Sequence, residues 1–281
     1  SPEPVLPVQF SRGCYYKDCA FCALTLDHQN FRQRDPGKTV DDLVWLKERY
    51  GAQSFFFTDE CFALSPTKRL CQQMIDRQVN VKWTCELRFE KNLSRELLTQ
   101  MRDAGCLKIV FGLESFNQRV MDFMKKGIKQ ESVRRIVDDC VDLGIAVHCY
   151  VIVGFPTEKE EEALETMNFV VGNTKLHESY GFSCQPCLFD LEKEAPIMSD
   201  PGSYGIRRIM RPATEDLSLG FFYEVQEGMT PAQAEQLYQQ VYEKISEVVC
   251  ELPFNYSMAD GLLYIARAKS QALQVPQPTV S

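Results

Sequence analysis

The segment Ser11-Arg12-Gly13-Cys14-Tyr15-Tyr16-Lys17-Asp18-Cys19-Ala20-Phe21-Cys22 holds three cysteines within nine residues. Three thiolates on one turn can bind three corners of a [4Fe–4S] cube, which leaves the fourth iron open to a ligand that is not a protein side chain. A structural zinc site would need a fourth cysteine or histidine, and the nearest histidine, His28, stands six residues after Cys22. The spacing favours an iron–sulfur loop, with a zinc site as the alternative.

The composition limits the kind of protein that can contain this loop. The chain has 281 residues, of which 44% are hydrophobic and 25% charged, so it has enough apolar material for one large α/β barrel. Twelve cysteines without a signal-peptide pattern are typical of a reducing compartment, and no apolar run reaches the length of a membrane span. We therefore expect a cytoplasmic protein without a membrane partner. A net charge of −8 argues against a nucleic-acid partner.

Short β-rich runs alternate with amphipathic helical patterns along the first two thirds of the chain. Strands are expected at 8–10, 54–57, 81–87, 107–111, 145–153 and 180–184, and helices begin near Thr39, Pro66, Ser94, Asn117 or Gln130, and Thr157. Ser65-Pro66 and Ser94 have the pattern of helix starts, and Gly105 and Gly144 that of helix ends. A spacing of about thirty residues predicts six right-handed βαβ units with a parallel sheet, either open or closed into a partial barrel.

The domain organisation follows from where this alternation begins and stops. Residues 1–7 are expected to be a linker or boundary, 8–189 the core, 190–270 a mostly helical extension that closes the barrel, and 271–281 a flexible tail. Within the extension, Asp190 to Pro212 mixes charge, proline and glycine and predicts a loop, whereas Thr230-Pro231 begins a helix through Val249.

Polar residues follow several of the predicted strands at their carboxyl ends, where parallel sheets bind ligands. They are Thr58-Asp59-Glu60, Arg88, Glu114-Ser115 and Gly154-Phe155-Pro156. Each has an ordinary structural interpretation, such as a turn cap for Asp59 or a solvated charge for Arg88. Their repetition at successive strand ends, beside the cysteine loop, favours one shared ligand site.

With these features the chain resembles radical S-adenosylmethionine (radical SAM) enzymes, in particular the branch whose members often carry an N-terminal cobalamin-binding domain. The resemblance covers Val8 to Leu188 and includes Arg12-Gly13 before the first cysteine and Phe21 before the third. The family's usual spacing is C-x3-C-x2-C, and this chain has the longer C-x4-C-x2-C. The cluster ligands implied are Cys14, Cys19 and Cys22.

The resemblance implies a partial (β/α)6 TIM-like barrel and an oxygen-sensitive [4Fe–4S] cluster with S-adenosylmethionine on its open iron. Reductive cleavage of that molecule would give a 5′-deoxyadenosyl radical, which removes hydrogen from a peptide or small-molecule substrate. The electron would come from a donor such as flavodoxin or ferredoxin. Cobalamin-dependent methylation is one implied outcome, with cobalamin supplied by a domain or partner outside these residues.

The resemblance also implies roles for the strand-end residues. Thr58-Asp59-Glu60 stands where the family has Gly-Gly-Glu, so Asp59 and above all Glu60 are candidates for the methionyl ammonium. The candidates for the methionyl carboxylate are Arg88 and Lys126, the latter expected on the helix after the fourth strand. Glu114 and Ser115 suit the ribose or the methionine moiety. Gly154 and Pro156 suit the adenine. Phe21, beside the third cysteine, is also expected to contact the cofactor.

Three alternatives stay open at this point. Cys184-Gln185-Pro186-Cys187 has metal-ligand spacing and would form a second site with Cys61, Cys85 or Cys149. His148 and Tyr150 share one face of the fifth strand, and point either into the barrel or into the core. The chain as a whole is either an enzyme, a zinc-binding protein, or a scaffold that binds S-adenosylmethionine without cleaving it.

Overall fold

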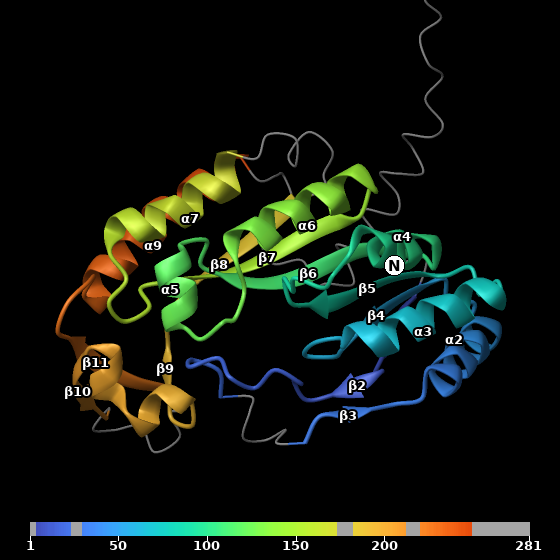
Figure 1. Ribbon diagram of the computed structural model, residues 1–281, viewed down its shortest axis with the longest axis horizontal. Helices are drawn as coiled ribbons and strands as arrows, with labels where there is room; N and C mark the ends of the chain where they lie inside the picture. Colours follow the sequence, from blue (N-terminus) through green and yellow to red (C-terminus); the bar gives the residue numbers. More distant parts are fainter. Residues whose placement is uncertain (1–3, 24–29, 173–181, 212–219, 249–281) are drawn as a thin grey trace, which may run out of the picture.

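The computed structural model describes residues 4–23, 30–172, 182–211 and 220–248. Its centre is a six-stranded parallel sheet with the strand order β1-β4-β5-β6-β7-β8 (Figure 1). These strands are β1 (Val5–Val8), β4 (Ser54–Phe57), β5 (Lys82–Leu87), β6 (Cys106–Glu114), β7 (Ala146–Val153) and β8 (Phe182–Leu188). The order follows the sequence throughout, and the sheet curves as a partial barrel. The expected fold class is confirmed.

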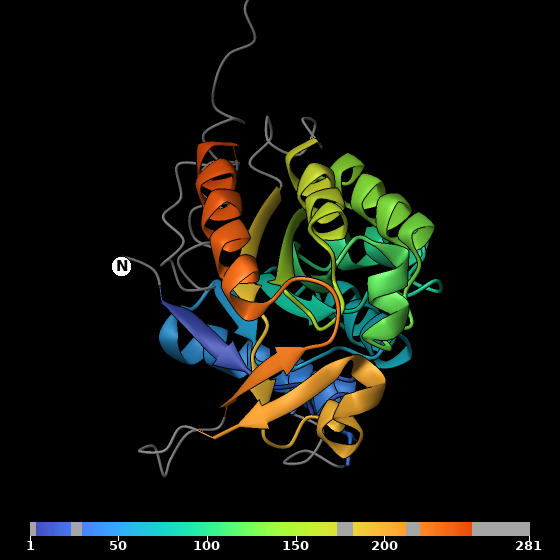
Figure 2. The same ribbon diagram turned by 90° about the vertical axis from the view of Figure 1, so that its left-hand side faces the viewer.

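The helices lie on one face of the sheet, which we call the outer face (Figure 2). They are α2 (Pro36–Tyr50), α3 (Leu64–Asp76), α4 (Arg95–Asp103), α5 (Gln118–Phe123), α6 (Gln130–Asp142), α7 (Glu160–Gly172) and α9 (Pro231–Val248). Phe55, Trp83 and Ile109 of the strands pack in one apolar core with Leu70 and Ile136 of the helices. Burial of this face supplies the main driving force for the fold.

The opposite, inner face of the sheet is polar. Since side chains alternate along a strand, Thr84 and Glu86 lie on the face opposite to Trp83 and Cys85, which are buried in the outer core. On the neighbouring strands, the inner face continues through Lys108 of β6, His148 and Tyr150 of β7, and Ser183 and Gln185 of β8. The barrel interior is therefore lined by groups that can bind a polar molecule.

A second, smaller sheet follows β8, where the sequence predicts a loop for Asp190 to Pro212. Its order is β10-β11-β9, made of β9 (Leu191–Glu192), β10 (Ile206–Met210) and β11 (Gly220–Val225). Two 3-10 turns, Pro196–Ser199 and Pro201–Tyr204, lie between β9 and β10. The loop prediction is wrong for the described part of this segment, and the extension, expected to be mostly helical, begins with this sheet and the two 3-10 turns. The strands are short and pair with partners far along the chain, so they give no local periodicity.

The small sheet lies beside the carboxyl end of β7. The Tyr223 hydroxyl donates to the Gly154 carbonyl oxygen at 3.3 Å, and Phe155, Phe189 and Tyr204 pack together in a second apolar cluster. After it, α9 packs against β8 and α7 on the outer face (Figure 1). The Thr230 hydroxyl accepts from Gln233 N, and Gln233 Oε1 accepts from Thr230 N, so the predicted helix start is confirmed.

Several predicted boundaries move by a few residues. β1 begins at Val5 because Val5–Val8 pairs in register with Ser54–Phe57, so part of the expected 1–7 linker belongs to the sheet. α2 begins at Pro36 rather than Thr39, since the Asp35 carboxylate accepts from Lys38 N as the N-cap.

Two other helix starts also differ. α3 begins at Leu64, which puts Ser65 inside the helix rather than at its cap. α7 begins at Glu160 because Thr157 has a left-handed φ of 72° and cannot start a helix. No helix within the described ranges is both long and apolar enough to span a bilayer.

Candidate functional site

Asp59, the second residue after β4, holds the start of the cysteine loop. Its carboxylate accepts from Phe10 N at 3.0 Å and from the Ser11 hydroxyl at 2.6 Å, and it also accepts from Ser11 N. The side chain is 1% exposed, and this burial raises the pKa of its carboxyl to about 6. These contacts place Asp59 under the loop backbone, as the residue that ties the loop to the sheet.

Glu60, the expected ammonium ligand, lies one residue further along the same turn. Its Oε2 accepts from Gly13 N at 3.0 Å, directly before Cys14. Gly13 has a φ of 84°, a conformation that glycine adopts without strain. The Glu60 carboxylate therefore lies next to the first cysteine of the loop, at the carboxyl end of the sheet.

The three loop cysteines are free thiols, with Cys19 buried and Cys14 and Cys22 half-buried. The pKa of Cys14 is lowered to about 5, chiefly by a hydrogen bond with Cys61, so this sulfur is available as a thiolate. Among the described residues, no three Cys, His, Asp or Glu side chains are gathered closely enough to hold a metal ion. The thiols fit an iron–sulfur cluster chemically, and binding it would draw the three sulfurs together.

The alternative of a second metal site around Cys184 and Cys187 gains no support from the positions of these two cysteines. Cys184 is buried on the outer face whereas Cys187 is exposed, so residues three apart on a strand point to opposite sides. His28, the candidate for a zinc site, lies outside the described residues.

Arg88 is a buried cation beside the loop, not a solvated surface charge. It follows β5 directly, is 5% exposed, and lies over the Tyr16 ring at 3.4 Å from the centroid. Its Nη1 lies 3.7 Å from Cys19 Sγ and its Nη2 donates to the Lys126 carbonyl oxygen. Its Nε makes no hydrogen bond within the described structure and lies 3.7 Å from the Glu90 carboxylate.

Lys126 and Glu114 form a buried ion pair next to Arg88, with 2.9 Å between Nζ and Oε1. Glu114 ends β6 with a φ of 62°, and Lys126 Nζ lies 5.5 Å from the Phe21 ring centroid. Lys126 stands in the loop after α5, which ends at Phe123, and not on a helix as predicted. A Cβ on Gly112 would lie 2.6 Å from the Glu114 carboxylate and 2.8 Å from Lys126 Nζ, so a larger residue there would displace this ion pair.

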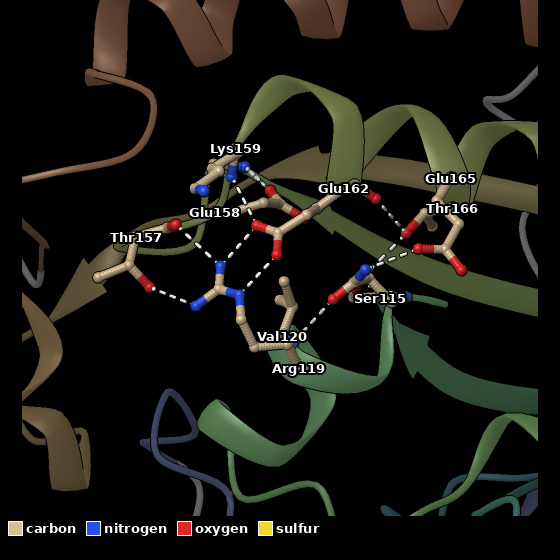
Figure 3. Close-up of polar contacts among 11 residues, drawn as sticks. Ser115, Arg119, Val120, Thr157, Glu158, Lys159, Glu162, Glu165 and Thr166 are labelled. Atoms are coloured by element: carbon tan, nitrogen blue, oxygen red, sulfur yellow. Dashed lines mark hydrogen bonds and ion pairs between the residues drawn. The ribbon is translucent and has the colours of Figure 1, made fainter.

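Ser115 contacts the protein rather than the open inner face. Its hydroxyl lies 3.2 Å from Thr166 Oγ1 of α7 and accepts from Asn117 N, before α5 (Figure 3). These bonds tie the end of β6 to α7 and give Ser115 a local structural role at the start of α5.

Sequence reasoning missed Glu158 and Arg119, which hold the segment after β7 (Figure 3). The Glu158 carboxyl accepts from Gly154 N at 2.7 Å, where Gly154 has a φ of 85°. Arg119 of α5 makes two 2.5 Å bonds with Glu162 and donates to the Thr157 carbonyl oxygen at 2.9 Å. Pro156 lies within the turn that these contacts hold in place. Glu158 was hidden in an acidic run that resembles a solvated helix start.

Replacing Glu158 by glutamine is expected to stabilise the protein at neutral and alkaline pH. Burial raises the pKa of this carboxyl from 4.5 to about 8, so between these values the folded state holds a proton that the unfolded state releases. Stability is full below pH 4.5 and falls towards pH 8, by at most about 1.4 kcal/mol per pH unit. Glutamine keeps the acceptor for Gly154 N without this penalty.

The measurement is urea unfolding of wild type, Glu158→Gln and the exposed control Glu161→Gln from pH 5 to 8. The stability advantage of Glu158→Gln should grow with pH and reach ~2 kcal/mol or more at pH 7.5. An advantage that is independent of pH, or one that Glu161→Gln reproduces, would contradict the buried protonated state of Glu158.

His148 and Tyr150 face the barrel interior, which settles the alternative left open by the sequence. Both are partly exposed, and their ring centroids lie 5.3 Å apart. His148 Nδ1 lies 2.7 Å from the Ser183 hydroxyl, and burial lowers the pKa of the imidazole to about 3. On β5, burial raises the pKa of the Glu86 carboxyl to about 7, and this side chain forms a hydrogen bond with Tyr150.

The geometry defines a class of protein: a partial parallel barrel with a three-cysteine loop after its first strand and charged side chains at the same end. The family model described as the radical SAM superfamily matches residues 8–170. The chain belongs to the radical SAM superfamily. The expected [4Fe–4S] cluster and S-adenosylmethionine are the cofactors of this family.

The similar proteins include methyltransferases and cyclases. An uncharacterized methyltransferase of Pyrococcus horikoshii is 27% identical over 165 residues, which cover 58% of this chain and 36% of that protein. The anaerobic magnesium-protoporphyrin IX monomethyl ester cyclase of Rubrivivax gelatinosus is 31% identical over 160 residues, covering 56% and 29%. The chain spans about a third of the length of these relatives.

Two solved structures share the fold. The radical SAM methyltransferase TsrM of Kitasatospora setae, with cobalamin and a [4Fe–4S] cluster bound, has a TM-score of 0.65 and 16% identity over 96% of this chain and 62% of that one. The cobalamin-dependent enzyme OxsB, with aqua-cobalamin bound, has a TM-score of 0.65 and 15% identity over 83% and 40%.

Proposed function

We propose that this chain binds a [4Fe–4S] cluster through Cys14, Cys19 and Cys22 and cleaves S-adenosylmethionine reductively to start a reaction inside the barrel. The observation that carries this proposal is the loop itself, fixed to β4 by Asp59 and Glu60 with the Arg88 guanidinium beside Cys19. When bound and reduced, the cluster supplies one electron that splits the cofactor into methionine and a radical able to remove hydrogen from the substrate.

The charged groups at the carboxyl end suit the two ends of an amino acid. Glu60 is our candidate for the methionyl ammonium, since its carboxylate lies against Gly13 next to Cys14. Arg88 is preferred to Lys126 for the methionyl carboxylate, because the Lys126 ammonium is tightly paired with Glu114 at 2.9 Å. The Glu90 carboxylate lies further from Arg88 Nε, at 3.7 Å, and Nε makes no hydrogen bond within the described structure.

The remaining proposed contacts are to the ribose, the adenine and the third cysteine. Glu114 would accept from the ribose hydroxyls, with Lys126 holding its orientation. The adenine would approach Gly154 and Pro156, where Glu158 fixes the backbone. Phe21 would cover the third cysteine, whereas Ser115 and Asp59 would act by holding β6 and the loop in place.

The substrate reaction we propose is cobalamin-dependent methylation, with cobalamin bound by a domain or partner outside these residues. The support is the similarity to proteins named as methyltransferases and the fold shared with cobalamin-bound enzymes. An electron donor such as flavodoxin or ferredoxin would reduce the cluster. The polar inner face suits a small molecule or a peptide side chain as substrate.

The test is anaerobic incubation of the cluster-loaded protein with S-adenosylmethionine and a chemical reductant, followed by chromatography. We expect 5′-deoxyadenosine and methionine, and additional S-adenosylhomocysteine when the cobalamin-loaded domain or partner and the methyl acceptor are also present. Absence of 5′-deoxyadenosine from protein that carries its iron would overturn the proposed activity. Deoxyadenosine without any S-adenosylhomocysteine in the reaction that holds the cobalamin-loaded domain or partner would overturn the methylation alone.

A further inference from the structure

A second set of polar side chains lies on the inner face of the sheet, near the amino ends of the strands. Lys108 of β6 is the register partner of Thr84 on β5. The Lys108 side chain is 9% exposed and Thr84 is fully buried. Lys108 stands four residues before Gly112, against which the Glu114 carboxylate and the Lys126 ammonium lie, and this corresponds to ~13 Å along the strand. This group is therefore separate from the charged residues around the cysteine loop.

Neither Lys108 nor Thr84 has a partner for its polar atom within the described residues. The Thr84 hydroxyl is buried without a hydrogen bond, and no ion pair or hydrogen bond of the Lys108 ammonium is found there, while burial lowers the pKa of that amine to about 8. A hydroxyl buried without a partner costs stability. A ligand that accepts from this hydroxyl and pairs with the nearby ammonium would recover that loss.

His148 lies close enough to Lys108 for the lysine charge to contribute to the lowered imidazole pKa, after the larger effect of burial. It is neutral, and its Nδ1 is engaged by the Ser183 hydroxyl at 2.7 Å. When that hydroxyl donates to Nδ1, the ring proton stands on Nε2 as a donor. Glu86, which bonds to Tyr150, lies in the same row of the sheet as His148, since both are register partners of Val110, two residues after Lys108.

We propose that Lys108, Thr84 and His148 bind a carboxylate group of the substrate. This inference rests on the proposed function, since it places the substrate in the barrel below the bound cofactor. A single ammonium with two neutral donors matches one negative charge. A phosphate ester, with a charge near −2, would need further cations and would meet the Glu86 carboxyl. The ~13 Å along β6 to the charged groups at Gly112 indicates a substrate that reacts several bonds away from its carboxylate.

The experiment measures binding of a carboxylate probe without turnover. Cluster-loaded protein with S-adenosylmethionine and no reductant is dialysed to equilibrium against radiolabelled heptanoate, and in parallel against heptanamide and hexyl phosphate. The proteins are wild type, Lys108→Met, the charge-preserving Lys108→Arg, and Lys82→Met as a control at the exposed first residue of β5. We expect Lys108→Met to bind heptanoate at least tenfold more weakly, Lys108→Arg to retain part of the affinity, and Lys82→Met to match wild type.

Thermal melting separates this role from a structural one. Because Lys108 has no partner within the described structure, Lys108→Met should melt at the same temperature as wild type or higher, whereas loss of a structural lysine would lower it. Equal heptanoate binding by wild type and Lys108→Met, equal binding of heptanamide, or tighter binding of hexyl phosphate would overturn the proposal. Since no reductant is present, these results are independent of whether the protein cleaves S-adenosylmethionine.

Discussion

Replacing Cys19 by alanine is expected to abolish both cluster loading and the formation of 5′-deoxyadenosine. Cys19 is the most buried of the three loop cysteines, and its sulfur lies 3.7 Å from Arg88 Nη1. Two thiolates cannot hold the cube that three would hold. Iron after anaerobic reconstitution should fall from about four per chain to less than one, and the nucleoside product to the level of the buffer blank.

The matched control is Cys71→Ala, at a cysteine buried between α3 and the sheet. It removes one thiol at similar cost to the core but leaves the loop untouched, so iron content should match wild type. Full iron loading of Cys19→Ala, or equal loss in both variants, would contradict the assignment of the loop as the cluster site.

Asp59→Ala is expected to have the second-largest effect, because it removes three hydrogen bonds at one buried position. Phe10 N, Ser11 N and the Ser11 hydroxyl would lose their shared acceptor. At about 1 kcal/mol per bond, and more for donors left buried, unfolding free energy should fall by ~3 kcal/mol. Iron loading should fall as well, since the loop loses its attachment to β4.

Asp59→Asn sharpens this test, since the amide keeps one acceptor oxygen in the same shape and should lose less stability than alanine. Asp41→Ala, which removes an exposed ion pair with Arg77, serves as the surface control. Urea unfolding and iron analysis of all three variants give the result. An Asp59→Ala protein with the stability and iron content of wild type would show that the loop is held by other contacts.

Much of the core could be predicted because it rests on local signals. The strand at Ser54–Phe57 was predicted at its observed bounds, since a short apolar run before polar residues has few alternatives. The Ser94 cap was also predicted, and its hydroxyl accepts from Leu97 N at 3.3 Å. The family assignment came from cysteine spacing, which needs no tertiary information.

The parts that the sequence did not reveal depend on partners far along the chain. The pairing of β10 with β11 and the acceptor role of Asp59, 48 residues after Ser11, involve no short-range pattern. The buried state of Lys108 and Glu158 was equally hidden, because lysine and glutamate are ordinarily read as surface residues. Only the fold shows that both are enclosed.

The central claim is that three cysteines leave one iron of the cluster open for S-adenosylmethionine. The most direct measurement is electron paramagnetic resonance of the reduced, cluster-loaded protein before and after S-adenosylmethionine is added. The claim predicts a [4Fe–4S]⁺ signal whose g-values shift on addition, because the cofactor becomes a ligand of the open iron. A cluster signal that is identical with and without S-adenosylmethionine would contradict it.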